Sequence, residues 1–449
     1  MRVTDMTHGR PIRLILLFSL PLMLGSVFQQ LYTIVDTIII GRGVGMQALA
    51  SIGAADWINW LVLWGLQGFT QGFAILAAQE FGAGAYDRLR RVLAMIVKLS
   101  CWFGIAVTII SLLLVRPLLS LLHTDPAVFG GAQTYLYVQF GGSLIIIAYN
   151  MAAAVLRCLG DSRTPLLAII AASFANIALD LLFVMGFGWG IFGASFATVL
   201  AQLIAFLLCL RSLRRLPFVQ LAKVDWKTDP AILLHLCRLG IPTGLQMSMI
   251  TLGGMVLQSV LNGFGVVFVA GYTAANKLYG ILESASVAFG YAMTAYMGQN
   301  RGARNAARID TGIRAVLALS AGFTAAIVTA MLLAGKPLLG LFLSTEEAGA
   351  ADALAVAYQY LMVLMAFLFA LFVLQAYRSS LQGLGEMTVP TLSGFVEMLM
   401  RMGAALVLPT FIGQSGVFFA EGAAWVCAAA LNLVWYYIRI GKIKRDMLK

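Results

Sequence analysis

Long apolar stretches alternate with short polar or charged connectors along the whole chain. Each apolar stretch meets or exceeds the roughly 20 residues that a helix needs to cross the hydrocarbon core of a bilayer. No alternation typical of a membrane β-barrel is seen, so we predict an all-α membrane protein. The twelve predicted membrane-spanning helices cover residues 11–40, 47–81, 92–121, 130–158, 163–186, 190–211, 232–262, 269–299, 311–342, 354–382, 388–411 and 416–440.

The composition strengthens this interpretation. Of 449 residues, 61% are hydrophobic and only 11% are charged, whereas soluble proteins carry about 25% charged residues. The net charge of +11 does not indicate a nucleic-acid partner, because the basic residues are spread over connectors and form no single patch. The lipid bilayer is the partner that this surface requires. The first apolar stretch is too long for a signal-peptide core, so we expect it to stay as the first helix.

The basic connectors predict the orientation in the membrane. When connectors are assigned alternately to the two sides, one side holds only Arg42, Arg116 and Lys336. Basic residues gather on the cytoplasmic side of membrane proteins. We therefore predict a multi-pass inner (plasma) membrane protein with both termini in the cytoplasm. The cytoplasmic side then receives, among others, Arg10, Arg13, Arg88, Arg90, Arg91, Arg157, Arg163, Arg211, Arg214, Arg215, Arg301, Arg304, Arg308, Arg378 and Arg439.

The second half of the chain repeats the first at a nearly constant offset. Pro21 recurs as Pro242, and the stretch 43–45 recurs as 263–265. Such a repeat predicts two parallel six-helix lobes, residues 1–215 and 231–449, joined by a basic cytoplasmic linker over 216–230. Two lobes of this kind suggest a transporter that works by alternating access around a shared cavity. The alternative is a duplicated bundle that only serves as a scaffold.

Acidic residues inside the predicted helices are the candidates for function, because burying a charge in a membrane is costly. Asp36 shares one face of the first helix with Gln29, Tyr32 and Thr33. The simpler interpretation places Asp36 among lipid headgroups, but it lies near a helix C-terminus, where the helix dipole opposes an acid. We therefore predict that Asp36 binds the coupling ion.

A second polar face lies in the fifth helix, where Asn176 and Asp180 are four residues apart, and Thr198 follows in the sixth. At ~1.5 Å per residue these side chains and Asp36 all lie roughly 6 to 17 Å below the outer boundary. Two carboxylates, an amide and a hydroxyl at one depth predict a site for a proton or a hard cation such as Na⁺. The alternative is that Asp180 only bonds Asn176 and neighbouring helices.

The matching positions of the second half are apolar, so ion coupling is expected to reside in the first lobe. Asn276 and Glu283 form a polar face that we assign to the substrate cavity, together with Gln29 and Tyr32. Glu397 and Arg401 lie four residues apart in one predicted helix and are expected to neutralise each other.

Pro21 lies inside the first predicted helix and is either a hinge of that helix or a static kink.

Motifs for ATP binding, metalloprotease or esterase chemistry are absent from the sequence, so we predict neither an enzyme nor an ATP-driven pump. No cofactor is expected besides the coupling ion.

Three stretches resemble the MATE (multidrug and toxic compound extrusion) family along the chain, namely 31–50, 78–84 and 156–165. The resemblance implies a V-shaped pair of bundles that exports cationic or amphipathic drugs in exchange for H⁺ or Na⁺. It also implies that Asp36 is the family's first-helix acid, that Pro21 is its bending proline, and that the DinF-like branch is the nearest. The ion site of that branch would match Asn176, Asp180 and Thr198, with Asn150 in the same network. The chain departs from the NorM-like pattern, because the seventh and tenth helices carry no acid in mid-span.

A lipid-linked substrate flippase of the same superfamily remains an alternative to the exporter, although it would need more intramembrane basic residues than Lys277 and Arg401. The expected substrates are small organic molecules, and the protein is expected to act as a monomer.

Overall fold

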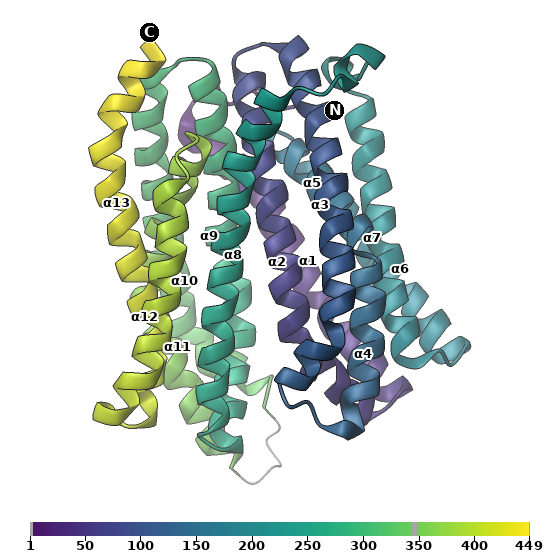
Figure 1. Ribbon diagram of the computed structural model, residues 1–449. Helices are drawn as coiled ribbons and strands as arrows, with labels where there is room; N and C mark the ends of the chain where they lie inside the picture. The colour runs from purple at the N-terminus through teal and green to yellow at the C-terminus, as the bar shows by residue number, and fades with distance from the viewer. Residues whose placement is uncertain (1–2, 344–348, 449) are drawn as a thin grey trace. The chain divides into compact units, whose positions relative to one another are not determined.

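The computed structural model describes residues 3–343 and 349–448, and no strand occurs among them. Helices joined by short connectors make up the described residues (Figure 1), which confirms the all-α membrane fold. The long helices are α1 (Pro11–Gly43), α2 (Met46–Gly82), α3 (Tyr86–Leu121), α4 (Pro126–Gly141), α5 (Ser143–Cys158), α6 (Arg163–Asp180), α7 (Gly190–Arg214), α8 (Pro230–Asn262), α9 (Val266–Gly302), α10 (Ala306–Gly340), α11 (Ala350–Gly383), α12 (Thr388–Ile412) and α13 (Phe419–Leu448). Short helices are η1 (Leu181–Gly186), η2 (Pro217–Val219), η3 (Lys223–Trp226) and η4 (Gln414–Phe418).

Most of these helices suit a membrane by length and composition. In the part of the chain that the structure describes, ten qualify as spans, and the bent pair α4 and α5 makes an eleventh. The remaining long helix, α9, has 37 residues. It carries Asn276, Lys277 and Glu283 near its middle, and these polar residues lower its hydropathy. Each predicted range therefore corresponds to a helix or to a broken pair of helices.

One predicted helix, 130–158, is wrong in form, because it consists of two helices bent by 50° at Gly142. A Cβ atom at Gly142 would lie 2.5 Å from Val199 Cγ2, so α7 packs directly onto the backbone at this point. Glycine pairs such as Gly141–Gly142 are common sites of helix kinks. The corresponding part of the second half carries no such pair, and α11 is unbroken.

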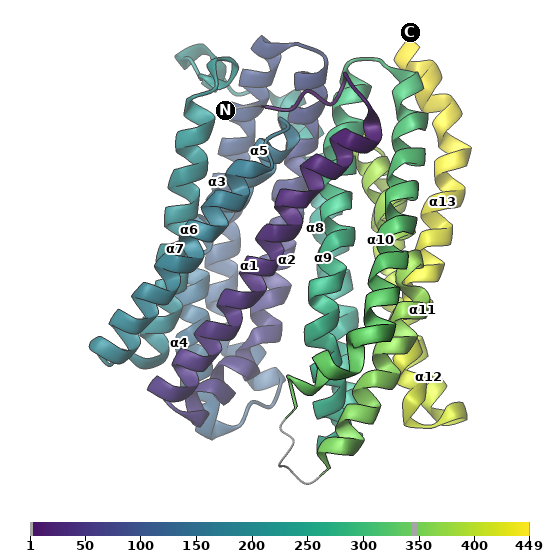
Figure 2. The ribbon, with the colours of Figure 1, turned by 180° about the vertical axis from the view of Figure 1, so that it is seen from behind.

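The internal repeat reappears in the lengths of the helices. α1 and α8 each have 33 residues and an internal proline, Pro21 or Pro242. α2 and α9 each have 37 residues and begin after a glycine with positive φ, Gly45 or Gly265. Pro21 does not end α1, which is continuous through it (Figure 2).

Internal contacts divide the chain into two units whose bounds differ from the predicted lobes. Unit 1 comprises residues 1–5 and 20–248, and unit 2 comprises 6–19 and 249–449. The first part of α1 thus belongs to unit 2, where Met6 N donates to Gln299 Oε1 at 2.8 Å. The predicted linker packs within unit 1, because Lys98 Nζ donates to Trp226 O at 2.5 Å. The division into two functional lobes, residues 1–215 and 231–449, stays a prediction.

Glycines allow two helices of unit 1 to approach closely. A Cβ atom on Gly72 of α2 would lie 2.6 Å from both Gly240 Cα and Leu239 O of α8. One turn away, a Cβ on Gly68 would lie 2.7 Å from Thr243 O. Small residues spaced four apart are typical of tightly packed membrane helices. Because the opposing atoms are backbone, they cannot turn aside as a side chain would.

We expect Gly72→Ala to destabilise the protein by about 1–3 kcal/mol, since the added methyl group forces α2 and α8 apart. Gly53→Ala is the matched control, because it lies on the same helix with nothing within 4 Å of its Cβ position. That change should be neutral or slightly stabilising. Thermal denaturation of both purified variants in detergent checks the difference, and equal midpoints would contradict the close approach.

Candidate functional site

The structure brings the two predicted coupling acids together. Asp36 of α1 is half-buried, and Asp180, the last residue of α6, is fully buried. Their carboxyl groups are direct neighbours that interact electrostatically. Both residues belong to unit 1. Since two carboxylates cannot donate to each other, the contact needs a proton or a cation between them.

Asp180 lies where α-helical geometry gives way to a π-helix. The six residues after it, Leu181–Gly186, are wound as a π-helix, η1. Single π-helical turns are rare and are often found at functional sites. The apolar sequence Leu181-Leu182-Phe183-Val184 carries no signal of this change, which the sequence analysis did not predict.

Several polar atoms beside this pair have no described hydrogen-bond donor or acceptor. They are both carboxylate oxygens of Asp180, one oxygen of Asp36 and both amide atoms of Asn176, which is 1% exposed. Buried polar atoms without a partner are costly, and few are left in native proteins. Asn176 and Asp180 lie one turn apart on α6, so their unsatisfied atoms share one face of that helix.

Aromatic hydroxyls surround the acids, and one of them was missed by sequence analysis. Tyr32 of α1 interacts electrostatically with both Asp36 and Asp180, in line with its predicted place on the polar face. Tyr135 of α4 also lies near Asp36 and Tyr32, and its hydroxyl oxygen accepts a hydrogen bond from Asn59 Nδ2 at 3.2 Å. Its partner Asn59 lies 76 residues away along the chain, on α2, so only the fold could reveal this contact.

Three other predicted site residues are not shown to contact the acid pair. Thr198 Oγ1 donates to Ala194 O at 3.2 Å, within α7. Asn150 Nδ2 likewise donates to Ile146 O at 2.9 Å, within α5. Gln29 is exposed on α1. Their roles in ion coupling or in the substrate cavity stay predictions.

Unit 2 contains a chain of buried ion pairs. Arg378 Nη2 lies 2.6 Å from Glu397 Oε2, and Arg401 Nη2 lies 3.1 Å from Glu397 Oε1 and 2.7 Å from Glu421 Oε2. The predicted pair of Glu397 and Arg401 is confirmed. Arg378 does not lie in a connector, because it is part of α11, is 3% exposed and is paired inside the bundle. The side of the membrane to which it belongs stays a prediction.

Two residues assigned to the substrate cavity lie on α9 of the same unit. Asn276 is exposed, whereas Glu283 is half-buried and lies one turn after Tyr279. Their assignment to a substrate cavity stays a prediction.

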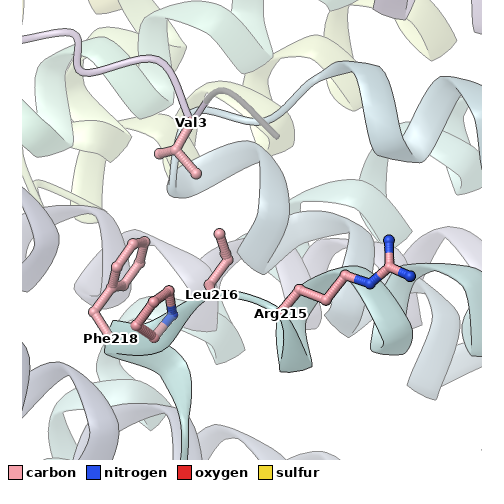
Figure 3. A pocket seen from close by; sticks show the side chains of 5 residues that line it. Val3, Arg215, Leu216 and Phe218 are labelled. Carbon is pink, nitrogen blue, oxygen red and sulfur yellow. The ribbon is translucent and has the colours of Figure 1, made fainter.

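One pocket of unit 1 lies elsewhere, at the predicted cytoplasmic linker (Figure 3). It has a volume of about 450 Å³ and is lined by Val3, Arg215, Leu216, Pro217 and Phe218. The guanidinium group of Arg215 points away from Val3 and Phe218 (Figure 3). The lining contains no carboxylate, so this pocket is not the predicted ion site.

The donor set at Asp36 and Asp180 suits a monovalent ion better than a transition metal. Among the described residues, no group of three or more His, Cys, Asp or Glu side chains is placed to hold a metal ion. Two carboxylates and an amide offer only hard ligands, which fit a proton or an alkali cation.

Comparisons with known proteins agree on the family. The MatE family model matches residues 21–182 and 242–407. The chain is 32% identical to the "Probable multidrug resistance protein YpnP" of Bacillus subtilis, over 99% of this chain and 98% of that protein. A crystal structure of a MATE protein in complex with MaL6 matches with a TM-score of 0.89 and 25% identity, over 99% of this chain and 100% of that one. A MOP superfamily transporter from Pyrococcus furiosus has the same fold, with a TM-score of 0.91, 24% identity and 99% of each chain covered. From the family match, the whole-length relative and the shared fold together, we conclude that this chain belongs to the MATE family of membrane transporters.

Proposed function

We propose that this protein is a secondary active antiporter that exports small organic molecules, cationic or amphipathic, in exchange for H⁺ or Na⁺. The observation that carries the proposal is the approach of the Asp36 and Asp180 carboxyl groups inside unit 1. Ionised carboxylates repel each other strongly where water is scarce. Binding of a proton or Na⁺ therefore stabilises the pair, and loss of that ion destabilises it.

This dependence supports a coupling mechanism. An ion that enters from outside binds between Asp36 and Asp180, and the bound state favours release of the organic solute. Tyr32 lies beside both acids and contributes a hydroxyl group to the same site. For Na⁺, the amide oxygen of Asn176 and the hydroxyl of Thr198 supply further ligands. The name of the Bacillus relative, a multidrug resistance protein, supports export of more than one compound.

Three finer assignments belong to the same proposal. We assign the chain to the DinF-like branch, since its two candidate coupling acids, Asp36 and Asp180, lie in the first half of the sequence. Both termini face the cytoplasm of the inner membrane, in accordance with the basic connectors. The protein works as a monomer, with Pro21 as a hinge in α1.

Flux measurements on purified protein in liposomes test the proposal. With ethidium, a fluorescent organic cation, as the transported probe, an inward gradient of H⁺ or of Na⁺ is imposed separately. We expect one gradient to accelerate ethidium movement well above that in protein-free liposomes, because binding of that ion stabilises the Asp36–Asp180 pair. Ethidium movement that responds to neither gradient, although the protein is folded and inserted, would contradict ion-driven export of this cation class.

A further inference from the structure

The connector between α7 and α8, residues 215–229, is held along the side of α3. Its two short helices, η2 and η3, both pack against α3. The ammonium group of Lys98 on α3 donates to Trp226 O at 2.5 Å and to Thr228 Oγ1 at 2.9 Å. All of these residues belong to unit 1. The connector is therefore fixed in place, and the side chains that it exposes form a surface of defined position.

The acidic residue of η3 is turned inward. Asp225 is 4% exposed, and its Oδ2 atom accepts a hydrogen bond from Ala222 N at 2.8 Å and lies 3.8 Å from Arg90 Nε. The side chains left on the outside are two apolar residues, Val224 at 66% and Trp226 at 40% exposure, and the lysines beside them, Lys223 and Lys227. The exposed part of this short helix is thus apolar in its middle and basic at both ends.

The contact with Lys98 places this surface at the membrane boundary. Lys98 lies inside the predicted span 92–121, ~9 Å from its first residue at ~1.5 Å per residue, and a lysine stem in this position carries its ammonium group back toward the headgroups. Further along the same face of α3, Trp102, Ile105 and Ile109 are all exposed. An exposed apolar stripe on a membrane-spanning helix is its lipid-facing side. The connector therefore lies where that side of α3 meets the headgroups.

The residue types at this position match a membrane interface. Tryptophan is enriched at the level of the headgroups, where its ring has an apolar and a polar side. Lys223, Lys227 and Arg91, which is exposed one heptad before Lys98, form no ion pair with any residue in the ranges 3–343 and 349–448. Basic residues beside a bilayer attract anionic lipids, whereas a zwitterionic headgroup offers no net charge to them.

We propose that this connector is an interfacial anchor that binds anionic phospholipid. Val224 and Trp226 enter the boundary between headgroups and acyl chains, and Lys223, Lys227 and Arg91 bind the lipid phosphate groups. The bound lipid holds the connector, and with it the start of α8, at a fixed depth in the bilayer. The inference rests on the membrane-spanning fold and does not depend on the proposed antiport.

Native mass spectrometry of the purified full-length protein tests the anionic selectivity, with phosphatidylglycerol and phosphatidylethanolamine titrated separately. We expect the wild type to bind phosphatidylglycerol more tightly than phosphatidylethanolamine. The double variant Lys223→Gln with Lys227→Gln should weaken the tightest phosphatidylglycerol binding by roughly 10–30-fold, as expected for two basic residues at an anionic surface. Lys442→Gln with Arg445→Gln is the matched control, because it removes the same charge from exposed residues of α13 and should leave this binding unchanged.

A second variant tests the apolar part of the anchor. Trp226→Ser keeps both lysines, so we expect it to weaken the binding of both lipids by the same factor, since contact with the acyl chains does not depend on headgroup charge. Unchanged binding of both lipids would place Trp226 outside the bilayer and overturn the inference. Melting temperatures equal to that of the wild type show that the variants are folded.

Two further outcomes contradict an anionic-lipid site. Equal affinity of the wild type for the two lipids, or unchanged phosphatidylglycerol binding by the lysine double variant, would show that the connector does not select an anionic headgroup. Displacement of phosphatidylglycerol by an equal concentration of inorganic phosphate would show a site for free phosphate instead. None of these measurements involves transport, so the inference and the antiport proposal can fail independently.

Discussion

Asp36→Asn is expected to reduce ion-driven efflux to the level of protein-free liposomes. The amide cannot take up and release a proton, and it replaces a charged ligand of Na⁺ with a neutral one. Because the substitution also removes the repulsion between Asp36 and Asp180, the variant should be at least as stable as the wild type. Ethidium flux under the gradient that drives the wild type, together with thermal denaturation in detergent, measures both effects.

Thr37→Val is the matched control for this experiment. Thr37 is the next residue of α1, is exposed, and donates its hydroxyl to Thr33 O at 2.8 Å within the helix. Replacement by valine keeps the shape of the side chain and should leave efflux close to that of the wild type. Undiminished gradient-driven efflux by the Asp36→Asn variant would show that Asp36 is not the coupling acid.

Arg378→Met is expected to be the most destabilising of these changes. The substitution leaves Glu397 with one guanidinium partner and gives the buried network an additional negative charge. Removing one partner of a buried ion pair costs about 3–5 kcal/mol. The double variant Arg378→Met with Glu397→Met should recover much of this loss, because Arg401 and Glu421 remain as a neutral pair. Equilibrium unfolding in mixed detergent micelles compares the variants.

A surface pair provides the reference for that measurement. Arg439 and Glu386 lie 3.0 Å apart, but the arginine side chain is 34% exposed. Arg439→Met should therefore cost no more than about 1 kcal/mol. If Arg378→Met lowers the free energy of unfolding no more than Arg439→Met does, the buried ion pairs contribute less to stability than their geometry indicates.

Sequence patterns predicted the features that depend on residues close together along the chain. Apolar length placed the helices, and spacing of four placed Asn176 with Asp180 and Glu397 with Arg401. Depth along the helices even predicted that Asp36 and Asp180 lie at one level. Equal depth in the membrane does not show which faces of two helices meet. The direct approach of the Asp36 and Asp180 carboxyl groups is a result of tertiary packing.

The features that were missed all depend on contacts between distant residues or on backbone geometry. Arg378 lies near a helix end, where a basic residue suggests the cytoplasmic boundary, and its partner Glu397 is 19 residues away. The position of Tyr135 depends on contacts between helices, because its partner Asn59 lies on α2 and Asp36 lies on α1. The bend at Gly142 follows from the packing of Val199 against a bare backbone.

The ion pairs of unit 2 also bear on how the chain is inserted during synthesis. Arg378 and Glu397 are 19 residues apart, and Arg401 and Glu421 are 20 apart, so each pair joins consecutive helices across a short turn. A helix that carries a lone arginine partitions poorly from the translocon into lipid, whereas a hairpin that buries the opposite charges against each other enters more readily. The last three helices should therefore leave the translocon together, and a ribosome stalled after α11 would retain that helix at the membrane pore.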